Sequence, residues 1–411
     1  MTASGLRSSF PQLANPLPLL IVDSHPIQYK APVYRKLATA FPDRVFVLYG
    51  CDASVRGKLE DPGFKRKLAW GEQLLEGYPH AFLTSGEEIA LGRFNALKGS
   101  GIGAWVRALK PRQMLLSQCN YQMDFRAILA AKRKGCKVWI RHETQDQAFE
   151  RSRAKSLARA VYYRLLYRLI DGAFACGKAN RSHLLRHGMQ EAAIGSAPYC
   201  VPDSIRMLSN SELDDCRNRL RADWGCHDET KVILFSGKFI PKKNPTLICQ
   251  ALAMLPENER KHYLAVFMGS GPLEQQLKEL CRQQAIPARF PGFVDQSDLA
   301  AYYLAADIMV LPSRRMGETW GLVVNEALQA GCAVAVSDAV GCHLEFEDWE
   351  RFVVFTDQHA AGLRDALRQL ALFAREFDWC RPEIEAYSVD AAARGIAETV
   401  FQSSLPGECQ R

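Results

Sequence analysis

The sequence lacks three features that would identify whole classes of protein. None of its apolar runs reaches the roughly 18 residues that a membrane-spanning helix requires. Its 13 cysteines include no C-x-x-C pair, which argues against zinc ribbons and dithiol redox sites. It also has no D-x-D sequence, whose closely spaced carboxylates could hold a hard cation. The odd number of scattered cysteines favours reduced thiols in a cytoplasmic protein.

What the chain does have is the composition of a globular protein. Its 411 residues are 48% hydrophobic and 24% charged, which excludes wholesale disorder and predicts about two to three domains. The charge is divided unevenly. Residues 1–200 carry 30 Lys and Arg against 15 Asp and Glu, whereas residues 201–411 carry 22 against 30. A basic half joined to an acidic half predicts two domains with different partners.

Short β-rich runs alternate with helical stretches along both halves of the chain. The predicted strands of the first half are 17–22, 45–49, 113–117, 137–140 and 172–176. Those of the second half are 232–235, 264–268, 308–311, 333–336 and 352–355. Helices are predicted between most of them, for example at 31–39, 124–134, 273–284 and 321–330. Such alternation is typical of parallel sheets that helices cover on both faces.

Residues 195–204 interrupt this alternation with two prolines and few apolar side chains, and we interpret them as a linker. The sequence therefore predicts an α/β protein of two doubly wound, Rossmann-like domains that face a cleft. The expected divisions are 1–200, 201–383, and a final helix and tail over 384–411. Because ligands of such sheets bind beyond the carboxyl ends of the strands, the cleft is the expected site.

The most informative stretch is 307–341, where a predicted strand runs through a polar loop into a helix. Glu318 stands before the predicted helix and Glu326 lies in its second turn, an E-x7-E spacing. Backbone N–H groups of residues 320–323 would be free at the helix start, where the helix dipole favours an anion. Two solvated carboxylates are the alternative, because charged residues are frequent in this chain.

Three further stretches follow the ends of predicted strands. After Gly237 come Lys238, Lys242 and Lys243, whose ammonium groups suit phosphate oxygens, although a solvated basic loop would look the same. The Gly269-Ser270-Gly271 sequence is a weak phosphate signal that a tight turn explains equally well. Backbone groups near Phe293, in a Phe-Pro-Gly-Phe-Val turn, could border a planar base.

In this order and spacing, the four stretches resemble the nucleotide-sugar domain of the family 4 retaining glycosyltransferases, which have the GT-B fold. Gly237-Lys238 followed by Lys243 resembles the family's G-R-L…K-G motif, and Glu318 and Glu326 match its E-x7-E. The resemblance covers most of residues 230–345 and is looser over the first 200. Even so, residues 20–34 look like the opening of bacterial members that act on envelope glycans, and residues 387–401 like the final helix that crosses back to the first domain.

The resemblance implies roles for the donor-side residues. Lys238 and Lys243 would neutralise the donor diphosphate and stabilise the leaving nucleotide. Glu318 would hold hydroxyls of the donor sugar, and Glu326 would accept hydrogen bonds from the ribose. The residues expected to bind the donor are Gly237, Gly269, Gly271, Phe293, Thr319, Trp320, Gly321, Leu322 and Glu326, with the amides of Gly321 and Leu322 at the distal phosphate.

In the first half, the resemblance points to His142 as a contact of the donor sugar near the reacting carbon. An ordinary core or boundary histidine is the alternative. His25, Gln28 and Arg141 are the acceptor-side candidates. The loop that carries His25 and Gln28 lacks the Gly-rich sequence of many family members, so these residues are expected to do something particular to this subgroup.

The resemblance implies a reaction that retains the anomeric configuration. The sequence identifies no carboxylate nucleophile of the kind that glycosidases use. We therefore expect front-face attack, in which the departing phosphate oxygen helps to deprotonate the acceptor hydroxyl while the two lysines stabilise the developing charge. Because no hard-cation site is evident, we expect neither a required metal nor another cofactor.

Two further features have competing interpretations. His183 and His187 are four residues apart on a predicted helix, but no third ligand is evident nearby, so a surface or boundary pair is favoured over a metal site. Residues 151–170 carry six Lys and Arg and no acidic residue. This segment predicts either a core helix with a solvated basic side, which we favour, or a helix that rests on an anionic bilayer.

The sequence thus predicts a cytoplasmic enzyme that transfers a sugar from a nucleotide donor, UDP before GDP, to a glycan or lipid-linked acceptor in cell-envelope polysaccharide synthesis. An anionic membrane surface is a further candidate partner of the basic half. The alternatives are another GT-B enzyme (a phosphorylase or a sugar-nucleotide epimerase), a non-catalytic glycan-binding scaffold, and a nucleic-acid-binding protein. The sequence carries no zinc finger, helix-turn-helix or RNA-binding signature, which argues against nucleic acid.

Overall fold

The computed structural model describes residues 13–61, 66–68, 72–87, 89, 91–296, 298–402 and 405. The chain divides into two compact units. Unit 1 comprises residues 1–144, 151–202 and 389–411, and unit 2 comprises residues 145–150 and 203–388. The interpretation of 195–204 as a linker is wrong at its start, because Ile194–Ser196 pairs as the last strand of the unit 1 sheet.

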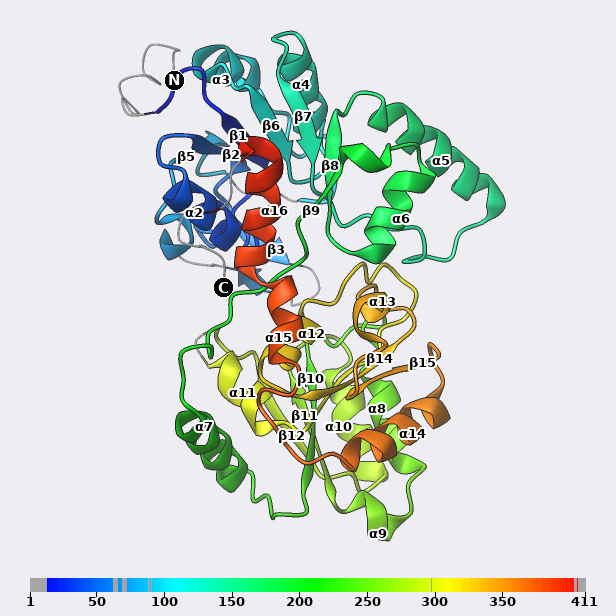
Figure 1. The fold of residues 1–411 in the computed structure, drawn as a ribbon. Coiled ribbons are helices and arrows are strands. Elements are labelled where there is room, and N and C mark those ends of the chain that lie inside the picture. The colour runs from blue at the N-terminus through cyan, green and yellow to red at the C-terminus, as the bar shows by residue number, and fades with distance from the viewer. Residues whose placement is uncertain are drawn as a thin grey trace. The chain divides into compact units, whose positions relative to one another are not determined.

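Unit 1 is built on a seven-stranded sheet in the order β5-β2-β1-β6-β7-β8-β9 (Figure 1). Every neighbouring pair of strands in this sheet is parallel. The strands are β1 (Leu19–Asp23), β2 (Val45–Cys51), β5 (His80–Thr84), β6 (Gln113–Leu116), β7 (Lys137–Ile140), β8 (Gly172–Ala175) and β9 (Ile194–Ser196), and a small antiparallel hairpin adds β3 (Leu59–Asp61) and β4 (Arg66–Leu68).

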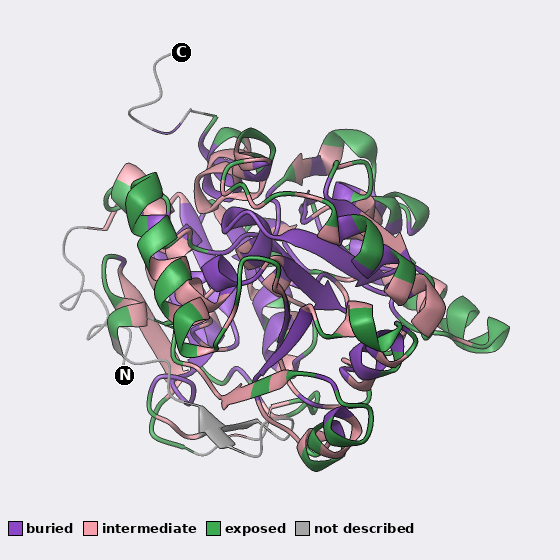
Figure 2. Cartoon of the chain, turned by 90° about the horizontal axis from the view of Figure 1, so that it is seen from below, coloured by how far each residue is buried: buried purple, intermediate pink, exposed green. Residues whose placement is uncertain are grey.

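Helices cover both faces of this sheet, and its strands β1, β2 and β8 are buried throughout, whereas β5 is only partly buried. Figure 2 marks the buried residues of the chain in purple. Leu20 and Val22 of β1 pack in one hydrophobic cluster, whereas their neighbours Leu19 and Ile21 point to the other face and pack in a second cluster. The helices are α2 (Ala31–Ala40), α3 (Ile102–Leu109), α4 (Gln122–Lys132), α5 (Arg153–Tyr167), α6 (Lys178–Arg186) and α16 (Val389–Phe401).

The last helix of the chain, α16, belongs to unit 1 and packs on α2. The ring of Phe401 stacks on Phe41, with 4.2 Å between the ring centroids. The Gln113 side-chain amide donates a hydrogen bond to the Val400 carbonyl oxygen at 2.6 Å. The α16 helix is therefore tied to the sheet through β6 as well as to α2.

Unit 2 is built on a six-stranded parallel sheet in the order β12-β11-β10-β13-β14-β15. The strands are β10 (Lys231–Ser236), β11 (Tyr263–Met268), β12 (Ala288–Gly292), β13 (Ile308–Leu311), β14 (Ala333–Ser337) and β15 (Phe352–Phe355). The helices are α7 (Asn210–Asp223), α8 (Thr246–Ala253), α9 (Glu257–Arg260), α10 (Glu274–Gln283), α11 (Leu299–Ala305), α12 (Val323–Gln329), α13 (His343–Phe346), α14 (Ala360–Ala371) and α15 (Arg381–Ile384).

One helix differs clearly from its predicted environment. The favoured interpretation of 151–170 as a core helix with a solvated basic side is wrong, because the apolar residues Leu157, Val161 and Leu165 of α5 are exposed. Only its last two residues, Leu166 and Tyr167, are buried.

Two expectations from the composition concern cysteines and membrane spans. Among the described residues, no helix is both long enough and apolar enough to cross a membrane. The twelve cysteines from Cys51 to Cys380 are all free thiols. Cys409 lies outside the described residues.

Candidate active site

The candidate active site of unit 2 lies where its strand order changes direction. From β10 the chain builds outwards through β11 and β12, and it then returns to β13 on the other side of β10. The loops that leave the carboxyl ends of β10 and β13 therefore diverge. In open α/β sheets, ligands bind in the crevice at this kind of position.

The loops after β10 and β13 are joined by an ion pair between Lys243 and Glu318. The Lys243 Nζ atom lies 2.7 Å from a Glu318 carboxylate oxygen. Lys242 Nζ lies 3.9 Å from the same oxygen, which also accepts a hydrogen bond from the Ser313 hydroxyl at 3.1 Å. Two residues that the sequence assigns separately to the donor are thus in direct contact.

Glu318 is a buried but ionised carboxylate, with 7% of the residue exposed. Burial by itself would raise the pKa of Glu318, but the charges of Lys243 and Lys242 and the hydrogen bond from Ser313 bring that pKa below its ordinary value. An anion that approaches Lys243 must therefore compete with this carboxylate for the ammonium group.

Glu326 has the opposite electrostatic environment. It lies in the first turn of α12, and one of its carboxylate oxygens accepts a hydrogen bond from the Tyr303 hydroxyl at 2.6 Å. Burial raises the pKa of Glu326 to about 7, and the hydrogen bond from Tyr303 offsets only part of this effect. At neutral pH the carboxylate is therefore poised between its charged and neutral forms.

The Gly269-Ser270-Gly271 turn packs against the loop that carries Lys238. A Cβ atom at Gly269 would clash with the Gly237 carbonyl oxygen, and one at Gly271 would lie only 2.6 Å from the Phe239 carbonyl oxygen. The Phe239 amide donates a hydrogen bond to the Ser270 carbonyl oxygen at 2.9 Å. The close approach of the two loops is thus sufficient reason for glycine at positions 269 and 271.

The helix predicted at 321–330 begins two residues later than expected. Gly321 has a φ of +101°, which lies outside the helical range, and α12 starts at Val323. Trp320 is buried and donates its indole hydrogen to the Asn325 side-chain oxygen at 2.8 Å. The Cys342 amide donates to the Trp320 carbonyl oxygen at 3.1 Å. This anchoring fixes the segment that connects Glu318 with Glu326.

The remaining donor-side candidates lie along the same edge of the unit 2 sheet. Lys238 follows the carboxyl end of β10, and Phe293 follows the carboxyl end of β12. Both side chains are partly buried, as are those of Thr319 and Leu322. The structure therefore brings the loops of all four motifs to one edge, with Lys243 and Glu318 in contact.

Unit 1 has its own change of strand direction, between β1 and β6, and sequence analysis missed the main residues there. Asp23 ends β1 and is fully buried. Its carboxylate accepts a hydrogen bond from the Tyr34 hydroxyl at 2.9 Å and lies 3.3 Å from Lys30 Nζ. The Tyr34 hydroxyl also lies 2.6 Å from Ser117 Oγ, beyond β6. An aspartate that ends an apolar strand was the signal that could have revealed this network.

The acceptor-side candidates His25 and Gln28 lie in the loop that follows Asp23. His25 Nδ1 is 2.8 Å from Ser24 Oγ, and burial lowers the pKa of His25 to about 4, so its ring is neutral at physiological pH. The side-chain oxygen of Gln28 is buried and has no hydrogen-bond partner among the described residues. Gln28 is therefore the candidate with an acceptor atom still to be satisfied.

Arg141 and His142 follow β7 and are both buried. Arg141 donates hydrogen bonds to the carbonyl oxygens of Ala197 and Pro198, at 3.0 and 2.7 Å. Its guanidinium is therefore already hydrogen-bonded to the backbone. His142 Nε2 lies 2.9 Å from the Tyr167 hydroxyl. Burial, helped by His183 and Arg159, lowers the pKa of His142 to about 3 and keeps the ring neutral.

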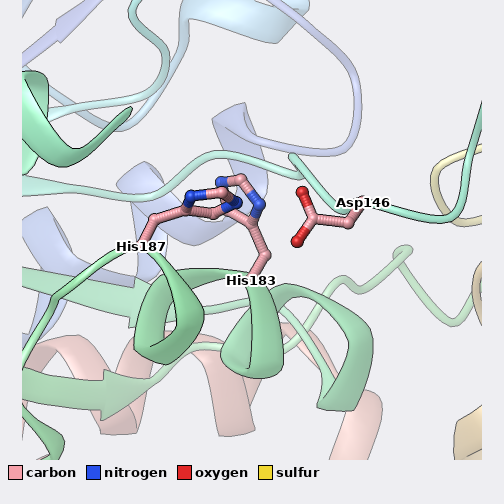
Figure 3. A group of neighbouring side chains, drawn as sticks. All are labelled: Asp146, His183 and His187. Atoms are coloured by element: carbon pink, nitrogen blue, oxygen red, sulfur yellow. The ribbon is translucent and has the colours of Figure 1, made fainter. Parts of the chain in front are cut away.

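The prediction that His183 and His187 form a surface or boundary pair is wrong. His183 lies on α6 and His187 lies at the carboxyl end of this helix, and both are buried. Their ring centroids are 4.4 Å apart, and Figure 3 shows the two side chains. His183 Nε2 lies 2.9 Å from the same Tyr167 hydroxyl that His142 contacts. Asp146, also shown in Figure 3, belongs to unit 2, and we assign no joint site to these three residues.

Comparison with known families places the unit 2 site in context. Residues 217–372 match the family model described as "Glycosyl transferases group 1". The matched region contains the Lys243–Glu318 ion pair, Glu326 and Tyr303, and the turn at residues 269–271.

Two curated proteins illustrate the relationship. The chain is 32% identical to D-inositol 3-phosphate glycosyltransferase 2 of Catenulispora acidiphila over 202 residues, which cover 43% of this chain and 46% of that protein. It is 29% identical to the phosphatidyl-myo-inositol mannosyltransferase of Mycobacterium tuberculosis over 191 residues, which cover 46% of this chain and 47% of that protein. The chain thus spans less than half the length of either relative.

Similarity to solved structures extends over nearly the whole chain. HepE of Anabaena, solved in complex with UDP-glucose, superimposes with a TM-score of 0.65 at 16% identity, covering 94% of this chain and 99% of that one. At this level of identity the match concerns the fold. The α/β fold with two Rossmann-like domains, predicted from the sequence as GT-B, is confirmed.

Proposed function

We propose that this protein is a retaining glycosyltransferase that moves a sugar from a nucleotide-diphosphate donor to a hydroxyl group of a glycan or lipid-linked acceptor. The observation that carries the proposal is the Lys243–Glu318 ion pair at the diverging loops of β10 and β13, inside the group 1 glycosyltransferase region. The Lys243 ammonium group, which the ionised Glu318 carboxylate holds in place, is suited to bind a phosphate group at this position.

On the donor side, Lys243 and Lys238 neutralise the diphosphate, and the backbone of Gly321 and Leu322 lies beside its distal phosphate. Glu318 then exchanges its contact with Lys243 for hydroxyls of the donor sugar. Glu326 accepts hydrogen bonds from the ribose hydroxyls, which favour its ionised form. UDP is the favoured nucleotide and GDP the second, and the UDP-glucose bound in the similar HepE structure is consistent with this order.

The chemistry is a front-face displacement. The bond between the anomeric carbon and the leaving phosphate oxygen breaks, and the acceptor oxygen forms the new bond on the same face. The acceptor proton passes to the departing phosphate oxygen, so the products are the glycoside and the nucleoside diphosphate. The two lysines stabilise negative charge that develops only as the bond breaks, which lowers the barrier selectively. We expect no required metal, so activity should persist in EDTA.

Unit 1 is the proposed acceptor side. Gln28 offers a buried oxygen that has no partner among the described residues, and it lies in the loop after Asp23. His142, buried and neutral, is proposed to contact the donor sugar near the reacting carbon. The basic charge of residues 1–200 suits a lipid diphosphate, an acidic glycan or the inner face of the cytoplasmic membrane in cell-envelope polysaccharide synthesis, rather than nucleic acid. The similarity to a phosphatidyl-myo-inositol mannosyltransferase supports a lipid-linked acceptor.

Thermal unfolding with a panel of nucleotides tests the donor assignment. A ligand that binds only the folded protein raises the melting temperature by mass action. We expect UDP and at least one UDP-sugar to raise it, GDP to raise it less, and ADP not to raise it. Equal shifts with all three nucleotides, or no shift at all, would contradict the assignment.

A further inference from the structure

The α5 helix of unit 1 exposes a continuous apolar stripe. Leu157, Val161, Leu165 and Leu169 follow one another at four-residue intervals, which places them along one side of the helix and the turn that ends it. Leu157 is 68% exposed and Leu165 is 55% exposed, and Val161 and Leu169 are exposed as well. The opposite side contacts the rest of unit 1 through Leu166 and Tyr167, so the stripe faces away from the core.

Basic residues border this stripe. Residues 151–170 carry six Lys and Arg and no Asp or Glu. By helical geometry, Arg153, Arg164 and Arg168 lie along one margin of the stripe and Lys155 lies near the other. Four of these side chains are exposed together with the leucines. An exposed apolar stripe with basic margins is complementary to the headgroup and upper acyl region of an anionic bilayer.

A pocket opens at the carboxyl end of the same helix. It has a volume of about 400 Å³ and is lined by Arg164, Arg168, His187 and Met189, among others. The Asp171 carboxylate in its wall is already engaged by Lys132 at 2.6 Å and by the Val138 amide at 2.7 Å. The positive charge that would attract an anionic ligand therefore comes from Arg164 and Arg168. A phosphate group is such a ligand, because its oxygens fit the hydrogen-bond donors of a guanidinium.

We infer that α5 docks unit 1 on a membrane that contains anionic phospholipid, with the stripe in the interface and a lipid phosphate in the pocket beside Arg164 and Arg168. This inference deepens the membrane part of the proposed function and rests on it. It defines the surface involved and the lipid class, and it requires no change in the Lys243–Glu318 site.

Flotation with vesicles tests the inference. The full chain is mixed with phosphatidylcholine vesicles of two kinds. One kind contains about 30% phosphatidylglycerol, which supplies anionic headgroups, and the other contains none. The test variant is the double substitution Leu157→Gln and Leu165→Gln, at exposed positions where a polar helix former should not affect folding. The matched control is Leu372→Gln in unit 2, at a leucine that is 86% exposed. Arg168→Gln probes the pocket.

The wild type and the Leu372→Gln control should float with the anionic vesicles and not with the neutral ones, and high salt should weaken this binding. The double variant should bind at least about tenfold more weakly, since two leucines no longer enter the interface. Arg168→Gln should weaken binding to anionic vesicles by a smaller factor.

Three outcomes would overturn the inference: no flotation of the wild type at low salt, equal flotation of the double variant, or a wild-type dimer that the double variant converts to a monomer. The last would assign the stripe to a second copy of the chain. The UDP-induced thermal shift is measured on the same samples. A retained shift with failed flotation rejects the docking surface alone, whereas a lost shift in the wild type rejects the proposed donor site.

Discussion

Lys243 and Glu318 form an ion pair of 2.7 Å between the loop after β10 and the loop after β13. The two residues are 75 positions apart in the sequence. Their loops follow β10 and β13, which pair in parallel, so the two residues meet only when this sheet has formed. In the unliganded protein, Glu318 neutralises the cation that the proposed mechanism assigns to the diphosphate. In the proposed mechanism, donor binding therefore exchanges one anionic partner of Lys243 for another.

Replacing Lys243 by alanine should lower turnover by orders of magnitude, because the charge that develops on the leaving phosphate loses its closest cation. The measurement is the rate of nucleotide release from the donor under saturating conditions. Lys261→Ala is the matched control, since Lys261 is an exposed lysine of unit 2 at the end of α9 and should leave the rate unchanged. A near-wild-type rate for Lys243→Ala would remove this residue from the mechanism.

Replacing Glu318 by glutamine should separate nucleotide binding from sugar transfer. The variant frees Lys243 from its carboxylate partner, so the affinity for UDP alone should stay equal or increase. Turnover of the UDP-sugar should fall at least about tenfold, because a hydrogen-bond acceptor for the sugar hydroxyls loses its charge. Calorimetric titration with UDP and steady-state kinetics give the two values. A parallel loss of both would show that Glu318 acts mainly by holding the loops together.

Glu326 should make the stability of the unliganded protein fall as the pH rises. Its pKa is raised from 4.5 to about 7 in the folded protein, so between these values the folded state binds more protons than the unfolded state. Stability contributed by the neutral carboxyl is present below pH 4.5 and is lost as the pH rises through about 7, by about 3 kcal/mol for this shift. The Glu326→Gln variant lacks this titration. Urea unfolding of both proteins between pH 5.5 and 8 measures the difference, and parallel curves would contradict the raised pKa.

Replacing Gly269 by alanine should destabilise unit 2 beyond the backbone strain alone, because the new Cβ atom would clash with the Gly237 carbonyl oxygen. We expect a loss of about 2–4 kcal/mol in the free energy of unfolding. Gly225→Ala is the matched control, since Gly225 also has a positive φ but would place its Cβ in open space. Its cost should be about 1 kcal/mol. Equal costs at the two positions would mean that the loops of β10 and β11 can separate without penalty.

The parallel sheets could be predicted from the sequence because buried parallel strands are continuous apolar runs. The bounds predicted for β7, β13 and β15 are those of the structure. The three strands of these parallel sheets that the sequence analysis missed lack such a run. His80–Thr84 is only partly buried at a sheet edge, Ile194–Ser196 is three residues long, and Ala288–Gly292 contains a proline and a glycine. A strand at the edge of a sheet pairs with only one neighbour. Its side chains therefore show little of the apolar pattern by which a buried strand is predicted.

Motif spacing led to the loops of the site but not to its contacts. The sequence places Lys243 and Glu318 beyond strand ends, yet their pairing depends on β13 returning beside β10, which only the sheet order reveals. The stripe of α5 was misjudged for a related reason. Periodicity shows that Leu157, Val161 and Leu165 share a side of the helix, but whether that side meets the core or solvent depends on tertiary packing.

The measurement that tests the central claim most directly is the slow hydrolysis of a UDP-sugar by the wild type, followed by nuclear magnetic resonance in the absence of any acceptor. Water then takes the place of the acceptor hydroxyl. The account predicts release of UDP together with a sugar whose first-formed anomer has the configuration of the donor, and no release with Lys243→Ala. Release of the inverted anomer would contradict the retaining mechanism, and the absence of hydrolysis with UDP-, GDP- and ADP-sugars alike would contradict the assignment as a nucleotide-sugar transferase.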